Sequence, residues 1–130
     1  MFTIKKYNSG DFEMIKSWWD DKNEIAPTKD MLPETTFILN IGSTPSLCVS
    51  LYLTNSGHCY IENFAGNPLM KGSIRKEAGQ FLFEGITGYA KSLGYNKVVC
   101  FAHVDKLKER YKQFGLVPTL DNIQSFVKEI

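Results

Sequence analysis

The clearest pattern of hydrophobic and polar positions in the chain runs from Ser73 to Leu93. Apolar residues recur there at intervals of three and four, which is the spacing of a helix that buries one face. Gly94 follows, at the position where glycine commonly ends a helix. The apolar positions are Ile74, Ala78, Leu82, Ile86, Tyr89 and Leu93. The pattern predicts a long helix that packs on a sheet.

Three glycines, Gly79, Gly85 and Gly88, lie inside this predicted helix. A glycine in a helix interior costs about 1 kcal/mol relative to alanine. We expect another backbone segment to approach the helix closely at these positions, and the alternative is that the helix merely tolerates them.

Three strands are predicted before the helix. Thr36–Ile41 is apolar, and in Leu47–Thr54 branched aliphatic residues alternate with other residues, as in strands that bury one face. Asn55–Gly57 is a tight-turn sequence, so His58–Ala65 is expected to return as the third strand of an antiparallel meander. Asn67-Pro68 then ends the ladder, because proline has no backbone N–H to donate.

The N-terminal third is predicted to contain one strand and one helix. Phe2–Lys6 is a short strand, and Asn8 and Asp11 stand three apart like an N-cap and its reciprocal partner. The helix continues to about Lys22. The segment Asn23–Thr35 contains two prolines and no sustained period, so it is expected to be a long connection that can wall a binding site.

The chain beyond the long helix is predicted to form a strand, a helix and a hairpin. Lys97–Ala102 reads as a buried strand, and Asp105 is expected to cap a short helix that runs through Phe114. Gly115 follows as its C-terminal stop. Val117–Ile130 is expected to supply a final hairpin.

This order of strands and helices predicts a mixed α/β or α+β fold. A length of 130 residues with 43% hydrophobic residues suits one domain that spans residues 1–130.

The formal net charge of +1 gives no overall field toward nucleic acid or a membrane, so neither partner is expected. No stretch has the length of a membrane span or signal peptide. Three widely spaced cysteines suggest reduced thiols and a cytoplasmic location.

Several short segments resemble the GCN5-related N-acetyltransferase (GNAT) superfamily, and in particular a compact, phage-encoded branch of it. The resemblance covers nearly the whole chain and is densest from Leu51 to Leu116. The matching segments are Met31–Pro33, Leu51–Ser56, Ile61-Glu62, Asn67-Pro68, Arg75 with Ala78, Lys91–Tyr95, and Tyr111-x-x-x-Gly115-Leu116.

The resemblance implies a mixed, mainly antiparallel sheet flanked by helices. It also implies an enzyme that moves an acetyl group from acetyl-CoA directly to an amine, either a small molecule or a protein amino group. No covalent enzyme intermediate is expected, and no metal site or hydrolase-type nucleophile is apparent in the sequence.

The start of the long helix is the expected phosphate site of this cofactor. Helix N-termini offer unpaired N–H groups and a partial positive charge to anions. Cationic side chains at a helix N-terminus are unfavourable next to the positive end of the helix dipole, and a bound anion removes this conflict. The alternative is that Gly72-Ser73 simply caps the helix and that the cations lie in solvent. The expected cofactor residues here are Lys71, Gly72, Ser73, Ile74, Arg75 and Lys76. The chain departs from the family's Gln/Arg-x-x-Gly-x-Gly/Ala loop, because Asn67–Ala78 offers only Gly72 at the corresponding positions.

Two residues are predicted to be catalytic. Glu62 lies on an otherwise aromatic strand face, and partial burial raises carboxyl pKa values toward those of a general base; the alternative is a salt-bridged strand glutamate. His58 and His103 are further candidates for the base. The resemblance implies that Tyr111 is the general acid near the CoA sulfur, and packing is the competing explanation for it.

The family's third meander strand splays from its neighbour, and the resemblance implies that backbone N–H groups there stabilise the oxyanion. The corresponding residues are Phe64, Ala65 and Gly66.

The candidates for a homodimer surface are Tyr7, Trp18 and Phe126, although isolated aromatic residues usually belong to a core or its rim. The alternative to an enzyme is a GNAT-shaped module that binds acyl-CoA or a protein partner without turnover.

Overall fold

The computed structural model describes residues 1–102, 104–120 and 123–130, and a five-stranded sheet lies at its centre. The strands are β1 (Phe2–Lys6), β2 (Thr36–Ile41), β3 (Thr44–Tyr52), β4 (His58–Gly66) and β5 (Lys97–Val99). They lie side by side in chain order. Strands β1 to β4 pair antiparallel, whereas β5 pairs parallel to β4. The prediction of a mixed, mainly antiparallel sheet is confirmed.

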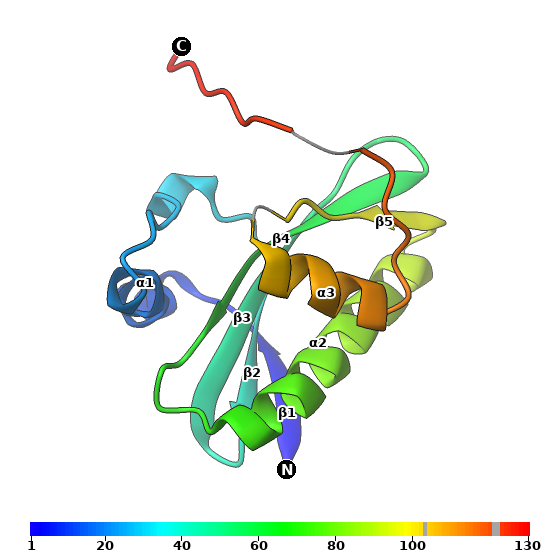
Figure 1. The fold of residues 1–130 in the computed structure, drawn as a ribbon. Helices are drawn as coiled ribbons and strands as arrows, with labels where there is room; N and C mark the ends of the chain where they lie inside the picture. The colour runs from blue at the N-terminus through cyan, green and yellow to red at the C-terminus, as the bar shows by residue number, and fades with distance from the viewer. Residues whose placement is uncertain (103, 121–122) are drawn as a thin grey trace.

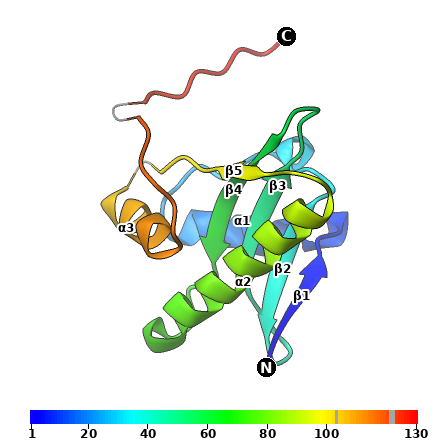
Figure 2. The same cartoon turned by 90° about the vertical axis from the view of Figure 1, so that its right-hand side faces the viewer.

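Helices cover both faces of this sheet. The α-helices are α1 (Phe12–Asp21), α2 (Gly72–Ser92) and α3 (Asp105–Gln113), and short 3-10 turns lie at Ser9–Asp11 and Lys29–Met31. α2 and α3 lie on one face and α1 lies on the other, as Figures 1 and 2 show from two sides. The sheet is therefore the middle layer of three.

Each face of the sheet has its own hydrophobic cluster, because strand side chains alternate between faces. On the α2 face, Leu82 and Ile86 pack with Val49 of β3. On the α1 face, Ile15 packs with Cys48, the neighbour of Val49 in the chain. The alternation that predicted β3 thus reflects burial on both faces. Trp18 and Trp19 are buried in the α1 cluster, while Tyr7 packs partly buried against it.

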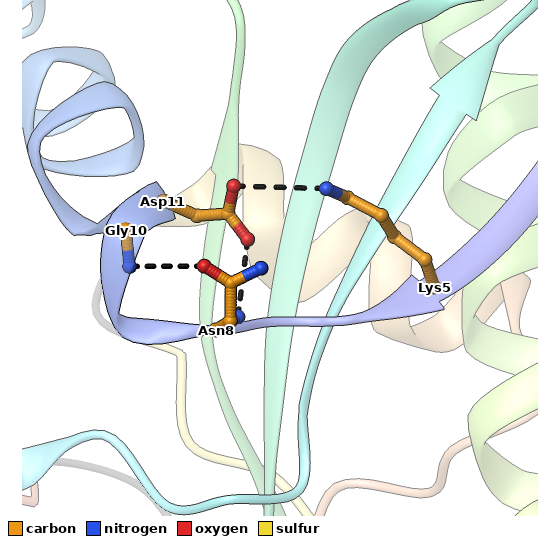
Figure 3. Close-up of polar contacts among 4 residues, drawn as sticks. All are labelled: Lys5, Asn8, Gly10 and Asp11. Carbon is orange, nitrogen blue, oxygen red and sulfur yellow. Dashed lines mark hydrogen bonds and ion pairs between the residues drawn. The ribbon is translucent and has the colours of Figure 1, made fainter.

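The connection from β1 to α1 is held by the predicted capping pair (Figure 3). The Gly10 amide donates to Asn8 Oδ1 over 2.9 Å, and the Asn8 amide donates to Asp11 Oδ2 over 3.0 Å. Lys5 Nζ lies 3.6 Å from Asp11 Oδ1. These contacts satisfy backbone donors that a helix start leaves open, so the capping box is confirmed.

The glycines of α2 differ in their surroundings. A Cβ atom at Gly85 would lie 2.7 Å from Ile4 Cδ1, and one at Gly79 would lie 3.2 Å from Arg110 Nη1. Nothing lies within 4 Å of such an atom at Gly88. Close approach therefore explains Gly79 and Gly85, but the approaching groups are side chains and not another backbone. At Gly88 the helix tolerates glycine.

The predicted C-terminal hairpin is wrong for the residues that the structure describes. Residues 117–120 and 123–130 contain no strand, and residues 123–130 extend away from the sheet in both overall views (Figures 1 and 2). Phe126 is 86% exposed in the single chain, and its role in a homodimer surface stays a prediction. A hairpin requires strands with a buried face, and this segment buries none of its large apolar side chains.

Two further boundaries differ from the prediction. β5 ends at Val99 and not at Ala102, and the N-cap of α3 is Val104, with Asp105 as the first helical residue and no side-chain cap. Among the described residues, no helix is long and apolar enough to cross a membrane. The three cysteines are free thiols, as expected.

Burial of the Cys48 thiol predicts that the free energy of unfolding depends on pH. Its pKa is raised to about 12, chiefly by burial, whereas an unfolded thiol ionises near pH 8.5. The folded protein therefore holds a proton that the unfolded chain has lost, and the free energy of unfolding should fall as pH rises above about 8.5. Denaturant unfolding of the wild type and of Cys48→Ala between pH 8 and 10 measures the slope.

The variant should show a shallower decline, by about one proton per molecule, because alanine has no proton to lose. Its stability at pH 7 should also drop, but that drop is common to all pH values and leaves the slope as the readout. Equal slopes in the two proteins would contradict the assignment.

Candidate active site

A cavity of about 370 Å³ opens between the end of β4, the first turns of α2, and α3. Strand β4 contributes Phe64, Ala65 and Gly66, and β3 contributes Leu47. The remaining lining residues come from the two helices, the segment before α3, and the segment after α1: Arg75, Gly79, Val104, Lys106, Leu107, Arg110, Phe114, Lys22 and Glu24. The cavity thus lies at the end of the sheet where β4 and β5 part.

The parting of these strands follows from the length of β5. Their parallel ladder has three pairs, from His58 with Lys97 to Tyr60 with Val99. Beyond Tyr60, β4 continues to Gly66 without a β5 partner among the described residues. α3 begins at Asp105 and packs Tyr111 against Phe64, with ring centroids 6.2 Å apart. A wedge-shaped opening beside β4 results, in agreement with the splay that the resemblance implied.

A β-bulge in β4 shapes the same edge. Ser50 pairs with Glu62 and Cys48 pairs with Ala65, so the register shifts by one residue between them. Asn63 lies in this bulge with φ 62°, in the left-handed region that asparagine adopts more readily than most residues. Its Nδ2 atom donates to Tyr52 Oη over 2.7 Å and to Ser50 Oγ over 3.2 Å. Hydrogen bonds from the Asn63 side chain to two side chains of β3 therefore hold the bulge in place.

Glu62 precedes the bulge and is half-buried. Its Oε1 atom accepts a hydrogen bond from the Phe101 amide over 3.2 Å, which ties the chain after β5 to β4. Its negative charge also contributes to raising the pKa values of Cys100 and Tyr111. The predicted base and the predicted acid therefore lie within electrostatic reach of each other.

Tyr111 is 7% exposed and lies among aromatic rings of β4 and α2. Burial raises its pKa well above the usual value, and the neighbouring Cys100 and Glu62 raise it further. The phenol forms a hydrogen bond with the Cys100 side chain, whose own pKa is raised to about 12, mainly by burial. At neutral pH the phenol keeps its proton, as a tyrosine of ordinary pKa also does, and the raised pKa makes it a weaker acid.

The N-terminus of α2 has no side-chain cap. Lys71 is the N-cap residue in an extended conformation, and Gly72 and Ser73 are exposed in the first turn. Ser73 therefore does not cap the helix, which was the alternative to a phosphate site. Of the residues predicted there, Arg75 lines the cavity, whereas Lys71, Gly72, Ser73, Ile74 and Lys76 are not part of its wall.

Of the two histidine candidates, His58 is not brought to this cavity. His58 lies at the first residue of β4, at the opposite end of the strand, where Nδ1 lies 3.1 Å from Ser56 Oγ and Nε2 lies 3.2 Å from Tyr60 Oη. It is half-buried. His103 lies outside the described residues.

Sequence reasoning missed the contribution of α3 to the cavity. Leu107, Arg110 and Phe114 share one helical face and line the cavity together. The spacing of three and four residues among these positions was the available signal. Among the described residues, no group of histidine, cysteine or carboxylate side chains has the arrangement of a metal site.

No protein-family model matches the chain, and no curated protein sequence matches it. Solved structures do match its fold. An aminoglycoside acetyltransferase from an uncultured soil metagenomic sample, in complex with sisomicin, is 13% identical with a TM-score of 0.70, over 98% of this chain and 97% of that one. Ard1 from Thermoplasma volcanium is 16% identical with a TM-score of 0.74, over 92% and 84%.

A predicted acetyltransferase from Clostridium acetobutylicum, solved with acetyl-CoA, is 14% identical with a TM-score of 0.65, over 97% of this chain and 96% of that one. The chain therefore has the fold of the GNAT acetyltransferases, and the resemblance found in the sequence is confirmed at the level of fold. The assignment to a phage-encoded branch stays a prediction.

Proposed function

We propose that the chain is an acetyl-CoA-dependent N-acetyltransferase that transfers the acetyl group directly to an amine, in the cytoplasm. The observation that carries the proposal is the cavity at the parting of β4 and β5, whose lining residue Phe64 packs against the buried ring of Tyr111. The fold that surrounds the cavity is shared with acetyltransferases, one of which was solved with acetyl-CoA. The acceptor is a small-molecule amine or a protein amino group.

The cavity fits an anionic, elongated cofactor. Its wall combines apolar side chains of β3, β4 and α3, suited to a pantetheine arm, with cationic side chains suited to phosphates. When bound, acetyl-CoA supplies the activated acetyl group. In this proposal Lys71, Gly72, Ser73, Ile74, Arg75 and Lys76 surround its phosphates. The open N–H groups of the first turn of α2 lack a capping side chain, which supports this role.

The residues of the β4 edge have separate tasks in the reaction. Glu62 takes the proton from the attacking amine, and Tyr111 gives a proton to the departing thiolate. Of the backbone N–H groups of Phe64, Ala65 and Gly66, those that point away from β3 lie where β4 has no β5 partner, and they donate to the acetyl oxygen as negative charge develops on it. The chain itself forms no bond to the acetyl group in this scheme.

Binding and turnover of acetyl-CoA test the proposal together. Acetyl-CoA at about a hundred times its dissociation constant should stabilise the protein by about 2.7 kcal/mol, measured by thermal unfolding. Addition of an amine panel should then release free thiol in the presence of the protein. Stabilisation without thiol release for any amine would instead identify a non-catalytic binding module, and absence of both responses would overturn the proposal.

Tyr111→Phe isolates the proton of the phenol. The ring and its packing against Phe64 and Phe83 stay, so acetyl-CoA affinity should change little. kcat should fall by about 10²-fold or more, because the departing thiolate loses its acid. Tyr95→Phe is the matched control: it removes a phenol that donates to the Thr54 carbonyl instead, and kcat should be retained. An unchanged kcat in Tyr111→Phe would show that Tyr111 serves packing alone.

Glu62→Gln tests the base. The amide oxygen of glutamine can still accept the Phe101 N–H, so folding and acetyl-CoA affinity should be preserved. kcat should fall by about 10²-fold or more near neutral pH. The deficit should shrink as pH approaches the pKa of the amine, because the acceptor then arrives already deprotonated.

The matched control is Glu109→Gln on the exposed surface of α3, which should leave the rate unchanged. A deficit in Glu62→Gln that is independent of pH would point to a positioning role for Glu62, with no proton transfer.

A further inference from the structure

The cavity wall has an excess of positive charge. Among the described residues that line the cavity, four have cationic side chains and one, Glu24, has a carboxylate; the cations are Lys22, Arg75, Lys106 and Arg110. The whole chain has a formal net charge of only +1, so this is a local concentration. Within the described residues, the ion pairs all lie elsewhere. A cavity of this kind is matched to an anionic ligand.

Arg110, like Lys22 and Lys106, was not expected at this site from the sequence. It is half-buried on α3, and within the described residues its guanidinium has neither a hydrogen bond nor an ion pair. Its Nη1 atom would lie 3.2 Å from a Cβ atom at Gly79, so the guanidinium lies over the glycine of α2. The absence of a side chain at Gly79 leaves that space to Arg110.

Arg75 lies on the same side of α2. Its Nη1 atom would lie 2.8 Å from a Cβ atom at Gly66, and its Nη2 atom donates to the Met70 carbonyl over a long 3.4 Å. Arg75 and Gly79 are four positions apart, so they share a helix face with Cα atoms about 6 Å apart. The guanidinium of Arg110 therefore lies about one helical turn from the point where Arg75 leaves α2.

Two guanidinium groups in this arrangement suit a diphosphate. Each has a planar set of N–H donors that binds phosphate oxygens in pairs, and a partly buried guanidinium without an acceptor is unfavourable. Adjacent phosphates share one bridging oxygen and present acceptors on both sides. Because Arg75 of α2 and Arg110 of α3 line the same cavity, a diphosphate bound there has acceptors to offer to both.

We propose that Arg110, acting with Arg75, binds the diphosphate of the CoA thioester across the cavity. The inference rests on the proposed function and extends it to a residue outside the phosphate site expected from sequence. It also accounts for the departure from the glycine-rich loop: Asn67–Ala78 contains only Gly72 at the loop positions. Guanidinium donors from two helices here replace backbone donors that closely spaced glycines would expose.

Affinity measurements with two ligands test the assignment. Calorimetry or competition binding compares acetyl-CoA with S-acetylpantetheine, which has the same thioester and arm but neither diphosphate nor nucleotide. Arg110→Gln should weaken acetyl-CoA binding by about 10- to 100-fold, the value of a charge-assisted hydrogen bond. The affinity for S-acetylpantetheine should stay within about twofold, and Arg110→Lys should lie between wild type and Arg110→Gln.

The dependence on salt gives a second readout that needs acetyl-CoA alone. The affinity of the wild type should fall with ionic strength, and the affinity of Arg110→Gln should fall less steeply, because one cation has been removed. Lys112→Gln is the matched control, since Lys112 is exposed on the same helix and does not line the cavity. Neither its affinity nor its salt dependence should differ markedly from those of the wild type.

Acetyl-CoA affinity that is unchanged in Arg110→Gln would overturn the inference. So would an equal loss for both ligands, because that result indicates a damaged cavity wall. The proposed function is judged separately, by thiol release on addition of an amine. A protein that binds acetyl-CoA through Arg110 but releases no thiol would keep this inference and remove the catalytic role.

Discussion

The candidate site depends on the short ladder between β4 and β5. A parallel pair of full length would satisfy the edge of β4 as far as Gly66 and leave no space beside it. Because β5 ends at Val99, the last residues of β4 have a partner only on their β3 side among the described residues. Backbone groups at such an edge need other partners. A ligand with its own polar groups can supply them.

The gap beside β4 is kept open by packing, not by a second ladder. Tyr111 and Phe114 of α3 pack with Phe83 of α2, at ring separations of 6.5 and 4.8 Å, and Phe64 of β4 packs with Tyr111. These large aromatic contacts hold α3 at a distance from β4 that a strand would not keep. Glu62 adds a polar tie, because its carboxylate accepts the Phe101 amide just after β5 ends. The opening is thus a property of the folded chain before any ligand binds.

Local patterns in the sequence predicted most of the elements, because each pattern had a direct physical cause. The period of three and four residues gave α2 within one residue of its observed ends, and the Asn8–Asp11 pair gave the start of the first helical segment. The C-terminal hairpin failed because no alternation supported it and β5 offers an edge of three residues. The splay of β4 from β5 was expected from the resemblance alone, since strand lengths do not reveal where two strands part.

The site was only partly accessible from sequence, because it is assembled from residues distant along the chain. Glu62 and Tyr111 were found by type and by resemblance, and the structure brings them within electrostatic reach. Arg110 was not singled out, because the type and spacing of a cation on a short helix do not show which groups surround it. A cationic side chain can be identified as a candidate ligand-binding group once the structure shows that no carboxylate pairs with it. That condition concerns three-dimensional structure and has no signature in the spacing of residues.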